Sequence, residues 1–290
     1  MTGGVALPRF NRTSQRVAIL SDIHGNLAAL QRVLDDLATQ STDRIVVAGD
    51  MVGFGPSSDA VVDLLIARGA EMIRGNHEQE YVAIYDTPAM PAEWKTRTRF
   101  GNGRWTMERL GTARRAFLVG LPDALDLDAR TLVVHGSPRS ARDAVLPTTS
   151  DADLEAMYTG SSARLVFMGH THKPLIRDIP SRRLVNVGSV GLPFDGDPRA
   201  SYAVVALPED SEAAIPEVTL HRISYDLDAA VAAYGNGLAA ADPYLAPILM
   251  LQVRTGGDYF ANWLRYSGDV PDEELPAALQ RFLASNKRQL

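Results

Sequence analysis

The 290-residue chain contains no cysteine, and this absence limits the kinds of site that it can build. Disulfides, iron–sulfur clusters and cysteine-ligated zinc are excluded, so a bound metal must use nitrogen and oxygen ligands. A mechanism with a cysteine nucleophile is excluded as well. The hydrophobic content of 46% nevertheless allows a large core without disulfides.

The chain also lacks any block of Lys or Arg, and its formal net charge is −6. Proteins that bind duplex nucleic acid usually present a basic face, so we expect no bulk nucleic-acid binding. No stretch approaches the ~18 consecutive apolar residues that a membrane-spanning helix needs. We therefore expect a cytoplasmic protein with no membrane partner, and a disordered lead-in over residues 1–15.

Apolar runs of strand length alternate with segments of helical periodicity in much of the chain. A helix is expected over 27–37, after the candidate N-cap Asn26, and a second one from residue 57 or 58. A third helix is expected near 151–158. This alternation is typical of βαβ units with parallel strands. The expected buried strands lie over 16–21, 44–48, 70–74, 131–134 and 164–168.

Three other segments depart from this alternation. Residues 79–121 contain few β-branched residues and predict a helical insert. An alanine-rich helical extension is expected over 226–290. We therefore expect one α/β domain over 16–225 that carries the insert. After His172 the pattern predicts an antiparallel set of strands over 175–179, 183–187, 202–207 and 218–223.

Five of the six histidines fall in short words rich in Asp, Asn and Gly, and each word follows an expected strand. The carboxyl ends of strands in α/β sheets line a common crevice, so residues far apart in sequence meet there. Neighbouring glycines allow the sharp turns that this convergence needs. The words are Asp22-Ile23-His24-Gly25-Asn26, Gly49-Asp50, Gly75-Asn76-His77-Glu78, His135-Gly136 and Gly169-His170-Thr171-His172.

These words supply more nitrogen and oxygen donors than one tetrahedral ion needs. They suit two ions that share a bridging carboxylate, for which Asp50 is the simplest choice. Two ions ~3.5–4 Å apart can stabilise the attacking and leaving oxygens of a phosphoester displacement. Mixed imidazole, carboxylate and amide ligation suits Mn, Fe or Zn, and we favour Mn. The candidate ligands are Asp22, His24, Asp50, Asn76, His135, His170 and His172.

The order of these words resembles the signature of the calcineurin-like metallophosphoesterases. The resemblance covers residues 16–205, and all five motif blocks are intact. Segments 21–27 and 186–191 are also similar to the small bacterial phosphodiesterase and phosphatase branch, although Val187 stands where that branch often has proline. The resemblance implies an α/β fold that is a four-layer α/β/β/α sandwich of two mixed sheets.

The resemblance also implies a role for each matching residue. His77 and the ligand Asn76 are the catalytic candidates, with His77 donating a proton to the leaving group or stabilising its charge. Glu78 would orient an imidazole. A hydroxide that bridges the two ions would attack phosphorus in line. One ion would be held by Asp22, His24, Asp50 and His172, and the other by Asp50, Asn76, His135 and His170.

Several side chains outside the words are weaker candidates. Arg139 and Arg142 could clamp a substrate phosphate, although a solvated loop is the simpler interpretation. Arg199 is expected to pair with a carboxylate, and His221 to take no part in chemistry. The aromatic side chains that could stack on a base, or simply pack in the core, are Tyr81, Trp94 and Trp105.

Together these features predict a hydrolase of phosphoric esters that acts as a phosphodiesterase or phosphatase on nucleotides or other small phosphoesters. A phosphoprotein phosphatase is the alternative within the same chemistry, because the metal centre does not define the substrate. A non-catalytic scaffold is disfavoured since no ligand of the pattern is missing. A one-metal hydrolase or metal-storage protein would leave Asn76 and His77 without a purpose. The oligomeric state is open, a homo-oligomer included.

Overall fold

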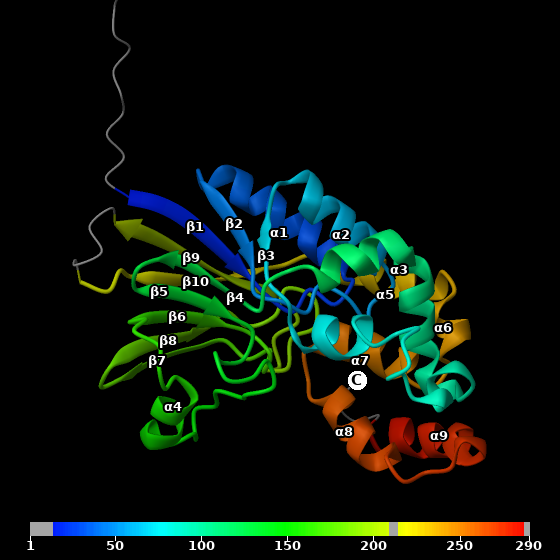
Figure 1. The fold of residues 1–290 in the computed structure, drawn as a ribbon. Coiled ribbons are helices and arrows are strands. Elements are labelled where there is room, and N and C mark those ends of the chain that lie inside the picture. Colours follow the sequence, from blue (N-terminus) through cyan, green and yellow to red (C-terminus); the bar gives the residue numbers. More distant parts are fainter. Residues whose placement is uncertain (1–13, 209–213, 287–290) are drawn as a thin grey trace, which may run out of the picture.

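The computed structural model describes residues 14–208 and 214–286, which form two five-stranded sheets packed between helices (Figure 1). The strand orders are β10-β9-β1-β2-β3 and β4-β5-β6-β8-β7. This arrangement is the α/β/β/α sandwich of two mixed sheets that the resemblance implied. The strands are β1 (Ser14–Leu20), β2 (Arg44–Val47), β3 (Glu71–Met72), β4 (Ala124–Asp128), β5 (Thr131–Val134), β6 (Leu165–Met168), β7 (Leu175–Ile179), β8 (Arg182–Asn186), β9 (Ala200–Pro208) and β10 (Val218–Ile223).

The helices cover the outer faces of both sheets and crowd one end of the sandwich. In Figure 1, α1 and α2 lie on the first sheet, α4 lies on the second, and the other helices gather beyond the strand ends. The helices are α1 (Leu27–Thr39), α2 (Ser58–Ala67), α3 (Gly101–Val119), α4 (Asp151–Met157), α5 (Leu227–Ala232), α6 (Leu238–Ala241), α7 (Ala246–Thr255), α8 (Tyr259–Ser267) and α9 (Leu275–Asn286).

The predicted start of α1 is confirmed by its N-cap. The side chain of Asn26 accepts a hydrogen bond from the backbone N–H of Ala29 at 3.1 Å, which satisfies one donor of the first turn. The second helix begins after Ser57, whose side chain makes no capping hydrogen bond. Asn26 therefore helps to determine where the chain turns from β1 into α1.

Alternate residues of the central strands enter two different apolar layers. In β1, Val17 and Ile19 lie in the layer between the sheets, whereas Ala18 and Leu20 pack under α1 and α2. Successive side chains of a strand point to opposite faces, so a strand covered on both faces needs an unbroken apolar run. This is why β1, β2, β5 and β6 are recognisable in the sequence.

The strands after His172 do not form the single antiparallel set that we expected. β9 and β10 pair antiparallel on the edge of the first sheet beside β1, whereas β7 and β8 belong to the second sheet. Moreover, β8 pairs parallel with β6. Short strands separated by turns do not reveal which sheet each one joins, because pairing depends on distant residues.

Two further strands differ from the expectation. The third strand is confined to Glu71–Met72 rather than 70–74. The sequence pattern missed β4, in which two aspartates interrupt the apolar residues and much of the strand is solvent-accessible. β4 lies at the edge of the second sheet, antiparallel to β5, so one neighbour is enough to support it.

Helices occupy both the predicted insert and the predicted extension. The insert contains a π-helical segment η1 (His77–Val82), two 3₁₀ segments η2 (Ala92–Lys95) and η3 (Thr98–Phe100), and α3. The extension contains α5 to α9 with the 3₁₀ segments η4 (Ala233–Gly235) and η5 (Asp272–Glu274). Most of the predicted lead-in lies outside the described residues, and its last two residues, 14 and 15, already belong to β1.

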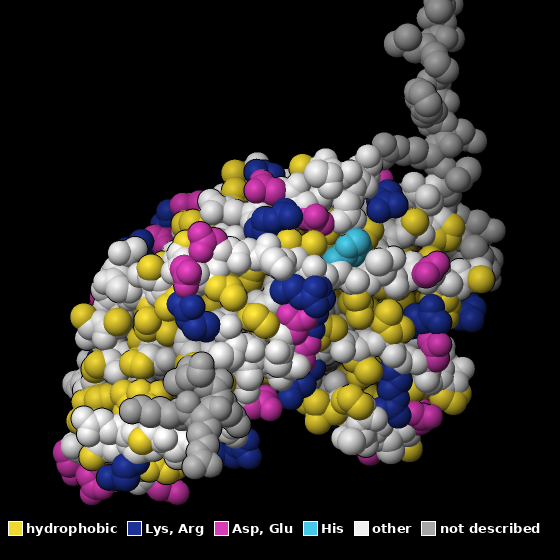
Figure 2. Space-filling model, turned by 180° about the vertical axis from the view of Figure 1, so that it is seen from behind, with side chains coloured by type: hydrophobic (Ala, Val, Ile, Leu, Met, Phe, Trp, Pro, Cys, Tyr) yellow, Lys and Arg dark blue, Asp and Glu magenta, His cyan; other side chains and the backbone are white. Residues whose placement is uncertain are grey.

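The surface agrees with the composition of the chain. The face in Figure 2 mixes Lys and Arg side chains with Asp and Glu side chains and shows no broad basic area. Among the helices of the described residues, none combines the length and the apolar character that crossing a membrane would require.

Candidate metal centre

The polar words meet where the central strands of the two sheets end. Backbone hydrogen bonds join their loops: the N–H of Asp22 donates to the carbonyl oxygen of Gly49 at 3.1 Å. The N–H of Gly169 donates to the carbonyl oxygen of His135 at 2.9 Å. The converging side chains follow strands of both sheets, as listed here: Asp22 and His24 after β1, Asp50 after β2, Asn76 and His77 after β3, His135 after β5, and His170 and His172 after β6.

A first group of donors surrounds Asp22. Nε2 of His172 lies 3.1 Å from Oδ1 of Asp22 and 3.3 Å from Nε2 of His24. Nε2 of His24 lies 3.8 Å from the same carboxylate oxygen. The three donor atoms lie within 4.8 Å of one another, close enough to share one ion.

A second group surrounds Asn76. Its Oδ1 lies 2.9 Å from Nδ1 of His170 and 3.1 Å from Nε2 of His135. Oδ2 of Asp50 lies 3.4 Å from Nε2 of His135 and 3.7 Å from Nε2 of His24. The carboxylate of Asp50 is therefore placed between the two groups of donors.

One of these metal-donor atoms lacks a hydrogen-bond partner among the residues that the structure describes. Oδ1 of Asp22 is buried and has no hydrogen bond of acceptable geometry within the described part of the chain, although Nε2 of His172 is near. A buried carboxylate oxygen without a partner is costly, and a bound cation would remove that cost. The residues present therefore fit divalent metal ions with nitrogen and oxygen ligation.

Backbone strain is concentrated at these residues. Of the eight non-glycine residues with positive φ that the described ranges contain, five are predicted ligands. Such conformations are uncommon for residues with a Cβ and persist where the surrounding structure compensates for them. The strained residues at the centre are Asp22, His24, Asp50, His170 and His172.

Backbone carbonyls orient three of the imidazoles. Nδ1 of His135 lies 2.7 Å from the carbonyl oxygen of Ala48, and Nδ1 of His172 lies 2.5 Å from that of Leu192. Nδ1 of His24 lies 3.2 Å from the carbonyl oxygen of residue 52. A proton on Nδ1 serves these contacts and leaves the lone pair of Nε2 facing the centre, the tautomer that a metal ligand requires.

Glu78 has a different role from the one expected. Its carboxylate contacts no imidazole and accepts backbone hydrogen bonds from the N–H groups of Asp50, Met51 and Gly75, at 2.8 to 3.0 Å. Glu78 thus ties the loop after β2 to the loop after β3. These loops, in turn, position the predicted ligands that they carry.

Two glycines are required by close approach. A Cβ on Gly53, whose φ is +87°, would lie 2.3 Å from Nδ1 of His77. A Cβ on Gly75 would lie 2.2 Å from Oδ1 of Asp50. Neither position has space for a side chain, so the glycines allow His77 and Asp50 to take their places.

The electrostatics of the centre follow from burial and from the mutual proximity of its groups. Burial lowers the pKa of His24 to about 3. Burial alone would lower the pKa of His135, but the carboxylates of Asp50 and Asp22 raise it to about 10. Burial alone would raise the pKa of Asp22, but the neighbouring imidazoles lower it to about 2. Without a cation, a protonated His135 therefore offsets carboxylate charge.

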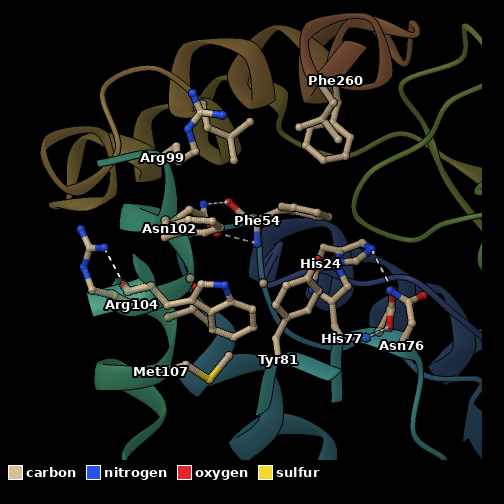
Figure 3. A pocket seen from close by; sticks show the side chains of 18 of the residues that line it. His24, Phe54, Asn76, His77, Tyr81, Arg99, Asn102, Arg104, Met107 and Phe260 are labelled. Atoms are coloured by element: carbon tan, nitrogen blue, oxygen red, sulfur yellow. Dashed lines mark hydrogen bonds and ion pairs between the residues drawn. The ribbon is translucent and has the colours of Figure 1, made fainter. Parts of the chain in front are cut away.

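The centre forms the floor of a pocket of about 390 Å³. Figure 3 shows His24, His77 and Asn76 at one end, with Tyr81 and Phe54 beside them. The loops after β2 and β8, the insert and the extension each contribute to the walls of this pocket. Further lining residues from these three parts include Trp94, Phe100, Asn102, Phe194, Leu245, Phe260 and Leu264.

The two arginines predicted as phosphate ligands do not line this pocket. Arg139 pairs with Asp143 at 2.8 Å, and Arg142 pairs with Glu80. Both side chains are 56% exposed and occupied by carboxylates. The arrangement corresponds to the solvated loop and corrects the expectation of a substrate clamp.

The aromatic candidates divide between the pocket and the core. Tyr81 and Trp94 line the pocket. Trp105 instead packs among apolar residues of the extension. The guanidinium carbon of Arg109 lies over the ring of Trp105, 4.9 Å from the centroid of that ring. Tyr81 and Trp94 thus remain candidates for substrate contact, and Trp105 has a packing role.

The predicted ion pair of Arg199 is confirmed, and His221 lies outside the pocket. Arg199 pairs with the carboxylate of Asp197 at 2.6 Å. The ring of His221, on β10, stacks on that of Tyr202 with centroids 4.8 Å apart, and it is not among the residues that line the pocket.

The sequence analysis missed several residues that shape the pocket. Asn102 exchanges two hydrogen bonds with the backbone of Phe54, at 3.0 and 3.1 Å, and so holds this residue at a φ of 62°. The turn around Gly53 and Gly55 was the only local signal for Phe54. Phe260 lies far along the chain in α8, and nothing local connects it with the metal ligands.

The chain belongs to the calcineurin-like phosphoesterase superfamily, whose domain model matches residues 16–210. The matched segment contains all of the predicted ligands and ends before the helical extension. Membership makes this chain a metal-dependent phosphoric ester hydrolase.

The chain is similar to two solved structures and to one further protein. A metallophosphoesterase from Sphaerobacter thermophilus is 26% identical, and the match covers 84% of this chain and 99% of that one with a TM-score of 0.65. A hypothetical protein from Pyrococcus horikoshii is 22% identical, with coverage of 83% and 98% and a TM-score of 0.67, which supports the fold. An uncharacterized protein of Methanocaldococcus jannaschii is 26% identical over 65% of this chain and 81% of its own length.

Proposed function

We propose that this chain hydrolyses small phosphoric esters with the help of two divalent metal ions, for which we favour Mn. The observation that carries the proposal is the position of Asp50. Its Oδ2 lies 3.4 Å from Nε2 of His135 and 3.7 Å from Nε2 of His24, so one carboxylate reaches both groups of donors. When bound, the ions would lower the pKa of a water molecule and offset charge on the phosphoryl oxygens.

The proposed ligand groups follow from the donor distances. Asp50 is proposed to contribute to both groups. Two sets of N and O donors around a shared carboxylate suit a dinuclear centre, whereas a single ion would leave several buried donors unused. The first set consists of Asp22, His24 and His172, and the second of Asn76, His135 and His170.

His77 is proposed to protonate the departing oxygen. Its imidazole is buried, lines the pocket beside His24, and has a ring centroid 4.8 Å from that of His24. Burial lowers the pKa of His77, so an imidazolium here releases its proton more readily than usual. The nucleophile would be hydroxide, formed when a water molecule loses a proton to solvent. As the hydroxide oxygen bonds to phosphorus and the ester P–O bond breaks, the proton of His77 would neutralise the leaving alkoxide.

The pocket favours small substrates. Its volume of about 390 Å³ falls within the range of small-molecule sites, and its walls are mostly apolar. A small phosphodiester or phosphomonoester is proposed as the substrate rather than a folded phosphoprotein. A cytoplasmic location, a homo-oligomeric state and the domain division at residue 225 stay predictions.

The test uses the full chain stripped of metal and then loaded with Mn²⁺. Bis-nitrophenyl phosphate, nitrophenyl phosphate and a phosphoserine peptide are compared as substrates. Metal-dependent release of nitrophenol, lost on chelation and absent from Asp50→Asn, supports the proposal. Equal turnover without metal would refute it, and a strong preference for the phosphopeptide would favour a phosphoprotein phosphatase.

A further inference from the structure

Aromatic rings form an almost continuous chain above the proposed metal centre. Four neighbouring pairs of these rings have centroids 4.6 to 6.1 Å apart, and Phe54 and Tyr81 are linked through the ring of His77, whose centroid lies 4.5 and 5.0 Å from theirs. All members line the pocket, and they come from the loops after β2 and β8, the insert and the extension. We call this set the aromatic arc; its members are Phe194, Phe260, Phe54, Tyr81, Trp94 and Phe100.

The arc makes direct contact with the proposed metal centre. The ring of Phe194 stacks on that of His172 with centroids 4.3 Å apart, and the ring of Tyr81 lies 5.0 Å from that of His77. A phosphoryl group at the centre would therefore leave its organic substituent among the rings. The labelled rings of Phe54, Tyr81 and Phe260 border the same pocket in Figure 3.

The charged side chains in the pocket wall are already held by protein groups. Arg99 donates to the carboxylate of Asp272 at 2.8 Å and to the carbonyl oxygen of Val270 at 2.5 Å. Nη1 of Arg104 donates to the carbonyl oxygens of Trp94 and Arg97, at 2.8 and 2.7 Å. With these arginines held by protein groups, the arc offers a substituent mainly apolar ring surface.

The extension is fixed against the insert where it completes the arc. A Cβ on Gly101 would lie 1.9 Å from the carbonyl oxygen of Ala241, so the two backbones are in direct contact. The N–H of Asn102 donates to the buried carboxylate of Asp242 at 3.2 Å. These contacts fix the end of α6 against α3, and α8, which carries Phe260, packs on the following helix α7. The extension lies outside the segment that the family model matches.

We propose that the aromatic arc is a subsite for a planar aromatic ring carried by the alcohol group of the phosphoester, and that Phe260 and Trp94 determine this specificity. The inference rests on the proposed function for the position of the phosphoryl group. A ring stacked on aromatic side chains is stabilised by both apolar burial and ring–ring contact, which an aliphatic chain obtains only in part.

The first experiment measures binding without metal or turnover. The chelator-treated full chain is titrated with adenosine, benzyl alcohol, ribose and hexanol, and tryptophan emission is recorded. We expect saturable quenching by adenosine or benzyl alcohol and none by ribose. Tighter binding of adenosine would indicate a nucleoside ester, and tighter binding of benzyl alcohol an aryl ester. No saturable change with either ring compound, or equal binding of hexanol, would overturn the proposal.

The second experiment compares matched variants. In Phe260→Leu, which retains all three tryptophans, we expect the dissociation constant of the better ring ligand to rise roughly threefold to tenfold. The control Phe117→Leu, on an exposed part of α3, should bind like the wild type. Circular dichroism melting checks folding. If Phe260→Leu fails to fold, Trp94→Leu provides a second variant, and its binding is measured by isothermal titration calorimetry because the tryptophan in the pocket wall has been removed. Unchanged binding in a folded variant would exclude that residue from the subsite.

A third measurement separates this inference from the proposed function. With Mn²⁺ bound, kcat/KM for nitrophenyl phosphate relative to glycerol phosphate should fall roughly threefold to tenfold in Phe260→Leu, mainly through KM. The ratio should be unchanged in Phe117→Leu. Ring binding without any hydrolysis would refute the proposed function alone, whereas hydrolysis with no ring preference would refute the subsite alone.

Discussion

The backbone N–H of His77 donates a hydrogen bond to Oδ1 of Asp50 at 2.8 Å. The other oxygen of this carboxylate, Oδ2, lies 3.4 Å from Nε2 of His135. The two oxygens of Asp50 therefore have different partners. The same contact places the proposed proton donor beside the proposed bridge. The proposed proton donor His77 and the proposed bridging ligand Asp50 are thus joined by a backbone hydrogen bond.

The first prediction concerns Asp50→Asn. An amide removes the negative charge that both groups of donors share, so we expect both ions to bind weakly and turnover to be lost. Metal content per chain after gel filtration, together with nitrophenol release, checks this. Asp178→Asn is the matched control, since Asp178 is an exposed partner of Arg183 on the edge strand β7. Two retained ions with a normal rate in Asp50→Asn would refute the bridging role.

The second prediction concerns His77→Ala. The metal content should stay close to that of the wild type, because His77 is not among the proposed ligands. Turnover should fall by roughly 10²–10⁴-fold, the usual contribution of a positioned acid, and the loss should shrink with good leaving groups such as nitrophenol. His221→Ala, on β10 outside the pocket, should behave like the wild type. An equal loss for every leaving group would argue against proton donation.

The third prediction is proton release on metal binding. Asp50 and Asp22 raise the pKa of His135 to about 10, so this imidazole is protonated in the metal-free protein at pH 8. A ligand must be neutral, so binding must expel the proton and should strengthen as the pH rises toward 10. His24, with a pKa lowered by burial to about 3, is already neutral and contributes no proton.

Isothermal titration calorimetry can check this release. Mn²⁺ is added at pH 8 in two buffers that differ in ionisation enthalpy, and the difference in observed heat gives the number of protons released. We expect at least one proton per chain. Identical heats in the two buffers would mean that His135 is neutral before the metal binds.

The fourth prediction concerns Glu78→Ala and stability. This change leaves the buried N–H groups of Asp50, Met51 and Gly75 without their acceptor. Each buried donor without a partner costs about 1–3 kcal/mol, so we expect the free energy of unfolding to fall by at least about 2 kcal/mol. Urea unfolding of the metal-free protein measures the loss.

Glu71→Ala is the control for Glu78→Ala. Glu71 pairs with the basic side chain of Arg44 rather than with buried backbone N–H groups, and its side chain is 40% exposed. Exposed ion pairs contribute at most about 1 kcal/mol, so this variant should remain near the wild type. A loss in Glu78→Ala no larger than in Glu71→Ala would mean that the loops hold together without the carboxylate.

Local pattern was sufficient for the central strands and for the convergence of the polar side chains that follow them. The apolar runs within β1, β2, β5 and β6 are covered on both faces, so consecutive residues in them are apolar. The same pattern did not identify the edge strand β4, because one face and one edge of this strand are exposed to solvent. The late strands were found but wrongly grouped, since nothing in a short strand encodes its sheet.

Glu78 shows the same limit of sequence-based prediction within the site. Its position in the motif predicted a contact to an imidazole, but its oxygens accept three backbone N–H groups instead. The imidazoles take their orientation from carbonyl oxygens, such as that of Ala48 beside His135. Every residue type supplies the same backbone carbonyl group, and nearly every type the same N–H group. The sequence therefore does not reveal which backbone groups a side chain will contact.

The sequence by itself determined that this protein has a metal-binding phosphoesterase chemistry, because its donors stand directly after apolar strands and the ends of such strands must converge. Only the tertiary structure decided what surrounds that chemistry. Phe54, Trp94 and Phe260 lie in three separate parts of the chain, and their proximity depends on how the insert and the extension pack together. Long-range packing of this kind leaves no periodicity behind, so the shape of the substrate pocket emerges only when the chain is folded.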